Sequence, residues 1–235
     1  MAFHPDNIHV AQGGANTITL HRVGEPGGSR VVAAFVGHTR AARRLAFSGD
    51  GRYLASCSLD NTVRVWDVAT GACIHVFQDD VHSFWSLDFS PDSRLLAGGG
   101  RTGIRLWDLG SGELLLGRHS ALAAATNIRP VAFSPDGTQL VSGGIDRCVR
   151  LWDLADAREL LCLRGHTADV TATRFLGDGE QLLSSSYDGT LRFWDVGTGR
   201  CLRTLWLPRP YEGMHIGGVT GLSPARAELR DAAVD

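Results

Sequence analysis

The chain has 235 residues, 43% of them hydrophobic, and a formal net charge of −2. This composition is sufficient for a globular core, and the near-neutral charge offers no electrostatic attraction to nucleic acid. No apolar run approaches the roughly 20 residues of a membrane-spanning helix, and the N-terminus lacks a secretory signal pattern. We therefore expect a cytoplasmic globular protein that binds neither nucleic acid nor membrane.

In chain order, the first predicted elements lie in residues 3–23, where β-rich runs are separated by turn residues. The same pattern recurs four times in longer form, so the chain is expected to begin partway through the first strand of a repeated unit. Phe3 stands where the later units end their first strand in Phe, and His21 stands where they have Trp.

The four later units end their third run in Trp-Asp, 41 to 45 residues apart, at Trp66, Trp107, Trp152 and Trp194. Each unit has four apolar runs separated by short turns rich in Gly, Pro and Asp. Such runs predict antiparallel strands joined by hairpins. We therefore predict an all-β fold of about five four-stranded units in residues 1–207, with the first unit incomplete.

The repeat pattern stops after Leu207, and residues 208–235 form a C-terminal tail. Within the tail, Ser223 is a good helix N-cap and Pro224 is a good first helical residue, so a short helix is expected there. The five cysteines include no C-x-x-C pair and are odd in number. This usage favours free thiols in a reducing compartment.

The Gly-His pairs at Gly37-His38 and Gly165-His166, together with the Trp-Asp pairs, resemble the WD-repeat β-propeller family over residues 1–207. The resemblance implies a ring of four-stranded blades around a central channel. It also implies a non-enzymatic scaffold, without a cofactor, that binds a protein or peptide partner.

The tail segment RPYEGMHIGGVTGLSPARAEL resembles the C-terminal tail of bacterial signalling and conflict proteins of the NACHT and STAND ATPase type. This second resemblance implies an alternative function, the sensor or regulatory part of such a system. A ring also needs its terminal strand edges paired. The tail segment HIGGVTGLSP, a second copy in a homodimer, or another partner chain could complete the ring.

The family resemblance implies a hydrogen-bond chain from a buried Trp indole through Ser and His to a turn Asp. A buried donor left unpaired would cost about 1 to 3 kcal/mol. The matching residues are Trp66, Ser56, His38 and Asp60 in the second unit, and Trp194, Ser184, His166 and Asp188 in the fifth.

Two units depart from this network. The fourth keeps Trp152, Ser142 and Asp146, but its His119 lies five residues further away than the other histidines. The third has Ala97 and Arg101 in the Ser and Asp positions, which predicts that it is the least stable of the complete units.

The resemblance also implies a rim at the upper mouth of the channel, where partner peptides bind. Arg, Trp and Tyr side chains at rim positions have the composition of an interaction hot spot. The predicted upper-face site consists of Arg43, Trp85, Arg129, Asp169 and Tyr187. The alternative for Trp85 is packing inside the channel.

Two patterns that suggest chemistry are better explained by structure. Ser, His and Asp within one unit are the residues of a hydrolase triad, but the set occurs twice at the same spacing and ends on Trp, as a structural clamp would. Gly98–Gly103 matches G-x-G-x-x-G, but a strand follows where a nucleotide-binding loop needs a helix. No histidine spacing suits a metal, so we predict no catalytic residue and no metal site.

Overall fold

The computed structural model describes residues 1–25, 28–78, 84–116 and 127–206. These residues form five four-stranded antiparallel sheets, which we call blades 1 to 5 in chain order, and they contain no helix. His119 and the tail, with its expected helix at Ser223, lie outside the described residues. No helix that could span a membrane occurs in the described part of the chain.

The strands of each blade pair in chain order. Blade 1 contains β1 (Ala2–Phe3), β2 (His9–Gly13), β3 (Thr17–Glu25) and β4 (Gly28–Val36). Blade 2 contains β5 (Ala42–Phe47), β6 (Tyr53–Ser58), β7 (Thr62–Asp67) and β8 (Cys73–Gln78). Blade 3 contains β9 (Phe84–Phe89), β10 (Leu95–Gly100), β11 (Gly103–Asp108) and β12 (Leu114–Leu116). Blade 4 contains β13 (Ile128–Phe133), β14 (Gln139–Gly144), β15 (Val149–Asp153) and β16 (Arg158–Leu163), and blade 5 contains β17 (Val170–Leu176), β18 (Gln181–Ser186), β19 (Thr190–Asp195) and β20 (Cys201–Trp206).

The predicted all-β fold and its five units are confirmed. The first unit has a first strand of only two residues, β1, as its sequence predicted. The segment Gly98–Gly103 is the end of β10, a tight turn and the start of β11, so a strand follows the glycines as expected, and Gly103 has a positive φ of 100° that favours glycine.

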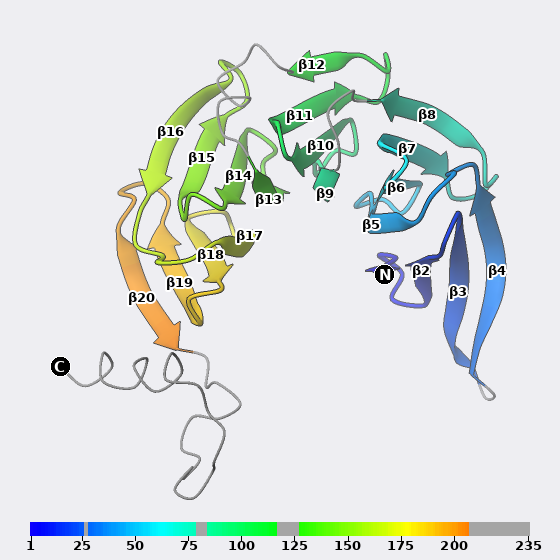
Figure 1. Ribbon diagram of the computed structural model, residues 1–235, viewed down its shortest axis with the longest axis horizontal. Coiled ribbons are helices and arrows are strands. Elements are labelled where there is room, and N and C mark those ends of the chain that lie inside the picture. The colour runs from blue at the N-terminus through cyan, green and yellow to red at the C-terminus, as the bar shows by residue number, and fades with distance from the viewer. Residues whose placement is uncertain (26–27, 79–83, 117–126, 207–235) are drawn as a thin grey trace, which may run out of the picture.

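The blades stand side by side in an arc (Figure 1). Their first strands lie on the inner side of the arc and their fourth strands on the outer side. Contacts join β5 to β9, β9 to β13 and β13 to β17, so each inner strand packs against that of the next blade. The described parts of blade 1 and blade 5 form the two ends of the arc and do not meet (Figure 1).

The hydrophobic core lies between the blades. Four clusters of buried side chains fill the spaces between consecutive blades, and each cluster contains one Trp of the Trp-Asp pairs. Trp66, Trp152 and Trp194 are each 1% exposed. Each of these indoles faces the blade that precedes it, so the repeated Trp holds consecutive blades together.

Polar side chains also cross between the inner strands of blades 3 and 4. The backbone N–H of Phe133 donates to Asp88 Oδ2 at 2.8 Å, and the N–H of Val131 donates to Ser86 Oγ at 3.2 Å. The innermost strand of a blade has an edge without a strand partner, so these bonds satisfy donors that would otherwise be unpaired. Burial raises the pKa of Asp88 to about 6, although the N–H of Phe133 opposes the increase.

Candidate partner-binding surface

A hydrogen-bond chain runs through blade 2 in the order that the sequence predicted. Trp66 Nε1 donates to Ser56 Oγ at 2.8 Å, and Ser56 Oγ lies 2.8 Å from His38 Nε2. His38 Nδ1 lies 2.8 Å from Asp60 Oδ2. Because Ser56 Oγ accepts from the indole, its own hydrogen is free for His38 Nε2, and His38 Nδ1–H then donates to Asp60.

The charges in this chain are set by burial and hydrogen bonding. Burial lowers the pKa of His38, and the neighbouring Asp60 offsets only part of this decrease. The imidazole is therefore neutral at pH 7. Burial alone would raise the pKa of Asp60, but hydrogen bonds from Thr62, Thr39 and His38 hold it below the ordinary value. The turn therefore contains a fixed carboxylate that orients the His38 ring.

Blade 5 repeats the same arrangement. Trp194 Nε1 donates to Ser184 Oγ at 2.8 Å, Ser184 Oγ lies 2.7 Å from His166 Nε2, and His166 Nδ1 lies 2.9 Å from Asp188 Oδ2. Ser184 is 1% exposed. A hydroxyl buried behind the indole offers no access to a substrate, so this geometry is that of a structural clamp.

Within the described residues, blades 3 and 4 show only part of the arrangement. In blade 4, Trp152 Nε1 donates to Ser142 Oγ at 2.8 Å, but Asp146 forms an ion pair with Arg150. In blade 3, Trp107 stacks on Phe77, with ring centroids 5.0 Å apart. The lower stability of blade 3 stays a prediction.

A β-bulge occurs in the first strand of blades 2 to 5, near the end where each strand begins. The strand pairing shifts between Ala42 and Arg44, around Trp85, between Ile128 and Val131, and between Val170 and Ala172. The bulged positions include Arg43, Trp85 and Arg129. A bulge turns a side chain away from the regular alternation of the strand, and bulges are frequent beside binding sites.

The comparisons with known proteins identify the fold family. Four segments match the family model described as WD domain, G-beta repeat: residues 29–67, 71–108, 125–153 and 157–195. The chain belongs to this WD-repeat family. The matched segments make up more than half of the chain and fall in blades 1 to 5, with blade 1 represented by its last strand.

Several curated WD-repeat relatives are similar to parts of the chain. The WD repeat-containing protein VIP3 of Arabidopsis thaliana is 31% identical over 157 residues, which cover 62% of this chain and 49% of the relative. The eukaryotic translation initiation factor 3 subunit I of Aspergillus terreus is 34% identical over 45% of this chain and 31% of the relative. The target of rapamycin complex subunit LST8 of Mus musculus is 33% identical over 47% of this chain and 33% of the relative. The chain therefore spans about half or less of the length of these relatives.

The upper face of this WD-repeat chain is the end of the blades that carries the bulges and the turns between second and third strands. Backbone bonds join these two features, since the N–H of Leu59 donates to Ala41 O and that of Tyr187 donates to Asp169 O, both at 3.0 Å. The turn residues and the bulge residues of one blade are therefore displayed together.

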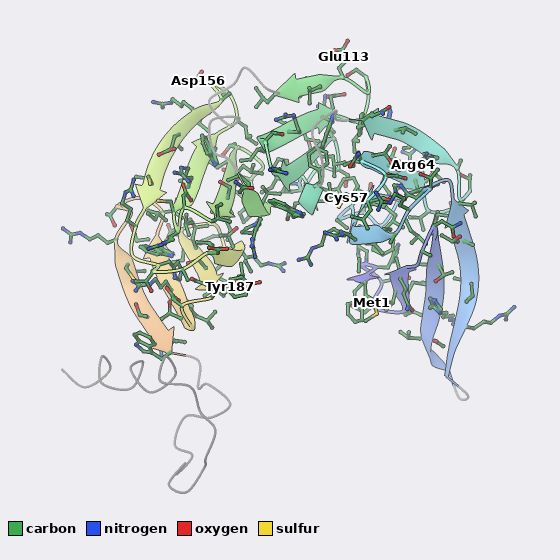
Figure 2. All side chains as sticks on the ribbon, viewed as in Figure 1. Met1, Cys57, Arg64, Glu113, Asp156 and Tyr187 are labelled. Atoms are coloured by element: carbon green, nitrogen blue, oxygen red, sulfur yellow. The ribbon has the colours of Figure 1, made fainter. Side chains whose placement is uncertain are left out.

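Three of the five predicted surface residues form one cluster across blades 4 and 5. Arg129 Nη2 lies 3.2 Å from Asp169 Oδ2, and Arg129 Nη1 donates to Tyr187 Oη at 3.3 Å. The guanidinium also lies over the Tyr187 ring, 5.4 Å from its centroid. Tyr187 is 68% exposed and lies on the inner side of the arc (Figure 2).

The other two predicted residues lie on blades 2 and 3. Arg43 is exposed on β5, whereas Trp85 on β9 is half-buried, and its carbonyl oxygen accepts from Arg44 Nε at 2.9 Å. Ile145 occupies in blade 4 the turn position that Tyr187 occupies in blade 5, and the structure shows that it is 43% exposed. Its place directly before the turn Asp was the sequence signal for it.

A second group of polar side chains, apart from the upper-face residues, was not predicted from the sequence. His4 and Asp6, in the turn between β1 and β2, and His9, the first residue of β2, have ligand-type atoms within 4.8 Å of one another. The expectation of no metal site stays a prediction, but the histidine spacings considered for it did not include this turn. The signal was the sequence HPDNIH, where three other repeats have Ser in place of the first His.

Proposed function

We propose that this chain is a non-catalytic scaffold that binds a protein or peptide partner on the upper face of blades 4 and 5. The observation that carries the proposal is the exposed Tyr187 ring, held by Arg129 at two points. An aromatic ring held in place before binding loses little conformational freedom when a partner covers it. Tyr and Arg are also the residue types that dominate binding energy at interfaces.

The exposed side chains on this face of blades 4 and 5 indicate the kind of partner. Ile145 and the Tyr187 ring provide apolar area, while Arg129 and Asp169 provide a charged donor and a charged acceptor. A peptide with one apolar side chain flanked by polar groups fits this mixture. The names of two relatives, a complex subunit and an initiation-factor subunit, support a role within a protein assembly.

Site-specific photo-crosslinking tests this proposal. A photoreactive phenylalanine analogue replaces Tyr187 in one protein and Trp206 in a control, because Trp206 is an equally exposed aromatic residue (72%) on the outer strand of the same blade. We expect a discrete partner to crosslink at position 187 in an extract of the source cells, and not at position 206. Tyr187→Ala should then weaken binding of that partner by about 30-fold, which corresponds to about 2 kcal/mol. Equal crosslinking at both positions would contradict the proposal.

We infer further that the arc acts together with additional blades, contributed by a second copy or by another chain. The support is that the described parts of blades 1 and 5 do not meet (Figure 1). Blade faces left open expose strand edges and apolar area, which favours association. Light scattering across a concentration series tests the homodimer, and a mass of one chain at every concentration would exclude it.

The cytoplasmic location and the role suggested for the tail also stay predictions.

A further inference from the structure

The turn between β1 and β2 brings together two imidazoles and a carboxylate. His4 Nδ1 lies 3.1 Å from Asp6 Oδ1, and His9 Nδ1 lies 2.6 Å from Asp6 Oδ2. The two imidazole rings are nearly perpendicular, at 85°, with centroids 5.9 Å apart. Two nitrogen ligands and one oxygen ligand of the types that zinc prefers therefore lie within 4.8 Å of one another.

The orientation of His4 leaves a lone pair facing Asp6. Its Nε2 lies 3.0 Å from the carbonyl oxygen of Gly51, which can only accept, so Nε2 carries the hydrogen. The backbone N–H of Asp6 donates to Nδ1 at 3.2 Å, which agrees with an unprotonated Nδ1. In this neutral tautomer the Nδ1 lone pair faces a carboxylate oxygen with no hydrogen between them, and a bound cation would convert that repulsion into attraction.

The contacts behind His4 also match those of a metal-ligating histidine. Such residues donate their second ring N–H to a carbonyl or carboxylate, which fixes the ring orientation. Here Gly51 of blade 2 supplies the carbonyl, and the Phe47 ring packs edge-on against His4 with centroids 5.0 Å apart. A metal at this point would therefore also strengthen the contact between blades 1 and 2.

The other repeats show that the turn itself does not need histidine. The His4 N–H donates to His9 O at 2.9 Å, and the equivalent bond from Ser48 to Tyr53 has the same length. In blades 2, 3 and 4 a Ser hydroxyl stands in the His4 position and donates to the turn Asp at 2.6 Å. These pairs are Ser48 with Asp50, Ser90 with Asp92, and Ser134 with Asp136.

We propose that His4, Asp6 and His9 bind a divalent transition metal, with Zn²⁺ as the probe. Their side chains are 17%, 34% and 27% exposed, so water can reach the cluster and fill the remaining coordination position. Binding requires His9 Nδ1 to release the hydrogen that it shares with Asp6, and Nε2 of the same ring can carry that hydrogen instead. For a neutral ring this exchange of tautomers needs no net loss of a proton from His9.

Zinc titration of the full chain without a histidine tag tests the proposal. The variants His4→Ser and His9→Gln introduce residues that other repeats carry at the same positions, so the turn is expected to fold in both. Asp136→Asn is the matched control, because it alters the same turn in blade 4, where no imidazole is present. Isothermal titration calorimetry and metal analysis after dialysis give the affinity and the number of bound ions.

We expect the unmodified chain to bind one more zinc ion than the double variant His4→Ser/His9→Gln. Each single variant should bind zinc at least about tenfold more weakly, and Asp136→Asn should match the unmodified chain. Zinc should also raise the melting temperature of the unmodified chain and not that of the double variant, because a ligand of the folded state stabilises it. Equal zinc binding by the double variant, or an equal loss in Asp136→Asn, would overturn the proposal.

Discussion

Replacing Ser56 by Ala removes the central member of the blade 2 hydrogen-bond chain. Ser56 is 0% exposed, and its hydroxyl bonds both Trp66 Nε1 and His38 Nε2 at 2.8 Å. The substitution leaves one buried donor and one buried acceptor without a partner. Each such group costs about 1 to 3 kcal/mol, so the expected loss of unfolding free energy is about 2 to 6 kcal/mol. A loss of this size is a large part of the stability of an ordinary domain.

Urea titration followed by circular dichroism and tryptophan fluorescence measures this loss. Ser29→Ala is the control, because Ser29 is exposed on β4 and its replacement should change the free energy by less than about 0.5 kcal/mol. Ser184→Ala should reproduce the effect of Ser56→Ala, since blade 5 has the same network. If Ser56→Ala and Ser29→Ala had the same stability, the argument that the hydroxyl holds the indole in place would be refuted.

Three further predictions concern other buried groups. The pKa of Asp88 is raised to about 6, so the folded state binds a proton at this carboxyl more tightly than the unfolded state does. As the pH rises from 4 to 6 the proton is lost, and the free energy of unfolding should therefore fall by up to about 3 kcal/mol. Urea titrations at several pH values should show this decrease in the wild-type chain and not in Asp88→Asn, whose amide oxygen still accepts from Phe133. The same dependence of unfolding free energy on pH in both proteins would contradict the prediction. Gly143→Ala should reduce the free energy of unfolding by about 1 to 3 kcal/mol and so lower the melting temperature, because the new Cβ would overlap Val170 of the next blade. An unchanged melting temperature would contradict the tight packing between blades 4 and 5. Burial raises the pKa of Cys57 to about 12, so iodoacetamide should label it only after unfolding, as peptide mass spectrometry can check.

The blades could be predicted because their information is local. Every strand pairs with its neighbour in the chain, and Trp66 stands only ten residues after the Ser56 that accepts its hydrogen bond. A repeated spacing at this range is visible in the sequence as a period. The absence of Ser and Asp at Ala97 and Arg101 could be read in the same way, one position at a time.

The upper-face cluster could be predicted only in part. The sequence pattern placed Arg129 and Tyr187 on the same rim, but it did not show that they touch although 58 residues separate them in the chain. The sequence places Ile145 directly before the turn Asp, but only the structure shows that its side chain is exposed. These relations depend on how one blade rotates against the next.

The sequence by itself determined the number of blades, the strands of each and the hydrogen bonds within a blade, because all of these involve residues close in the chain. The tertiary structure decided which side chains of different blades meet. It placed Tyr187 over Arg129, and it brought His4 of blade 1 to the Gly51 carbonyl of blade 2. The physical reason is that apolar packing between blades sets their relative positions. This packing involves whole sheet faces, and a repeat pattern of residues close in the chain does not show how two such faces fit together.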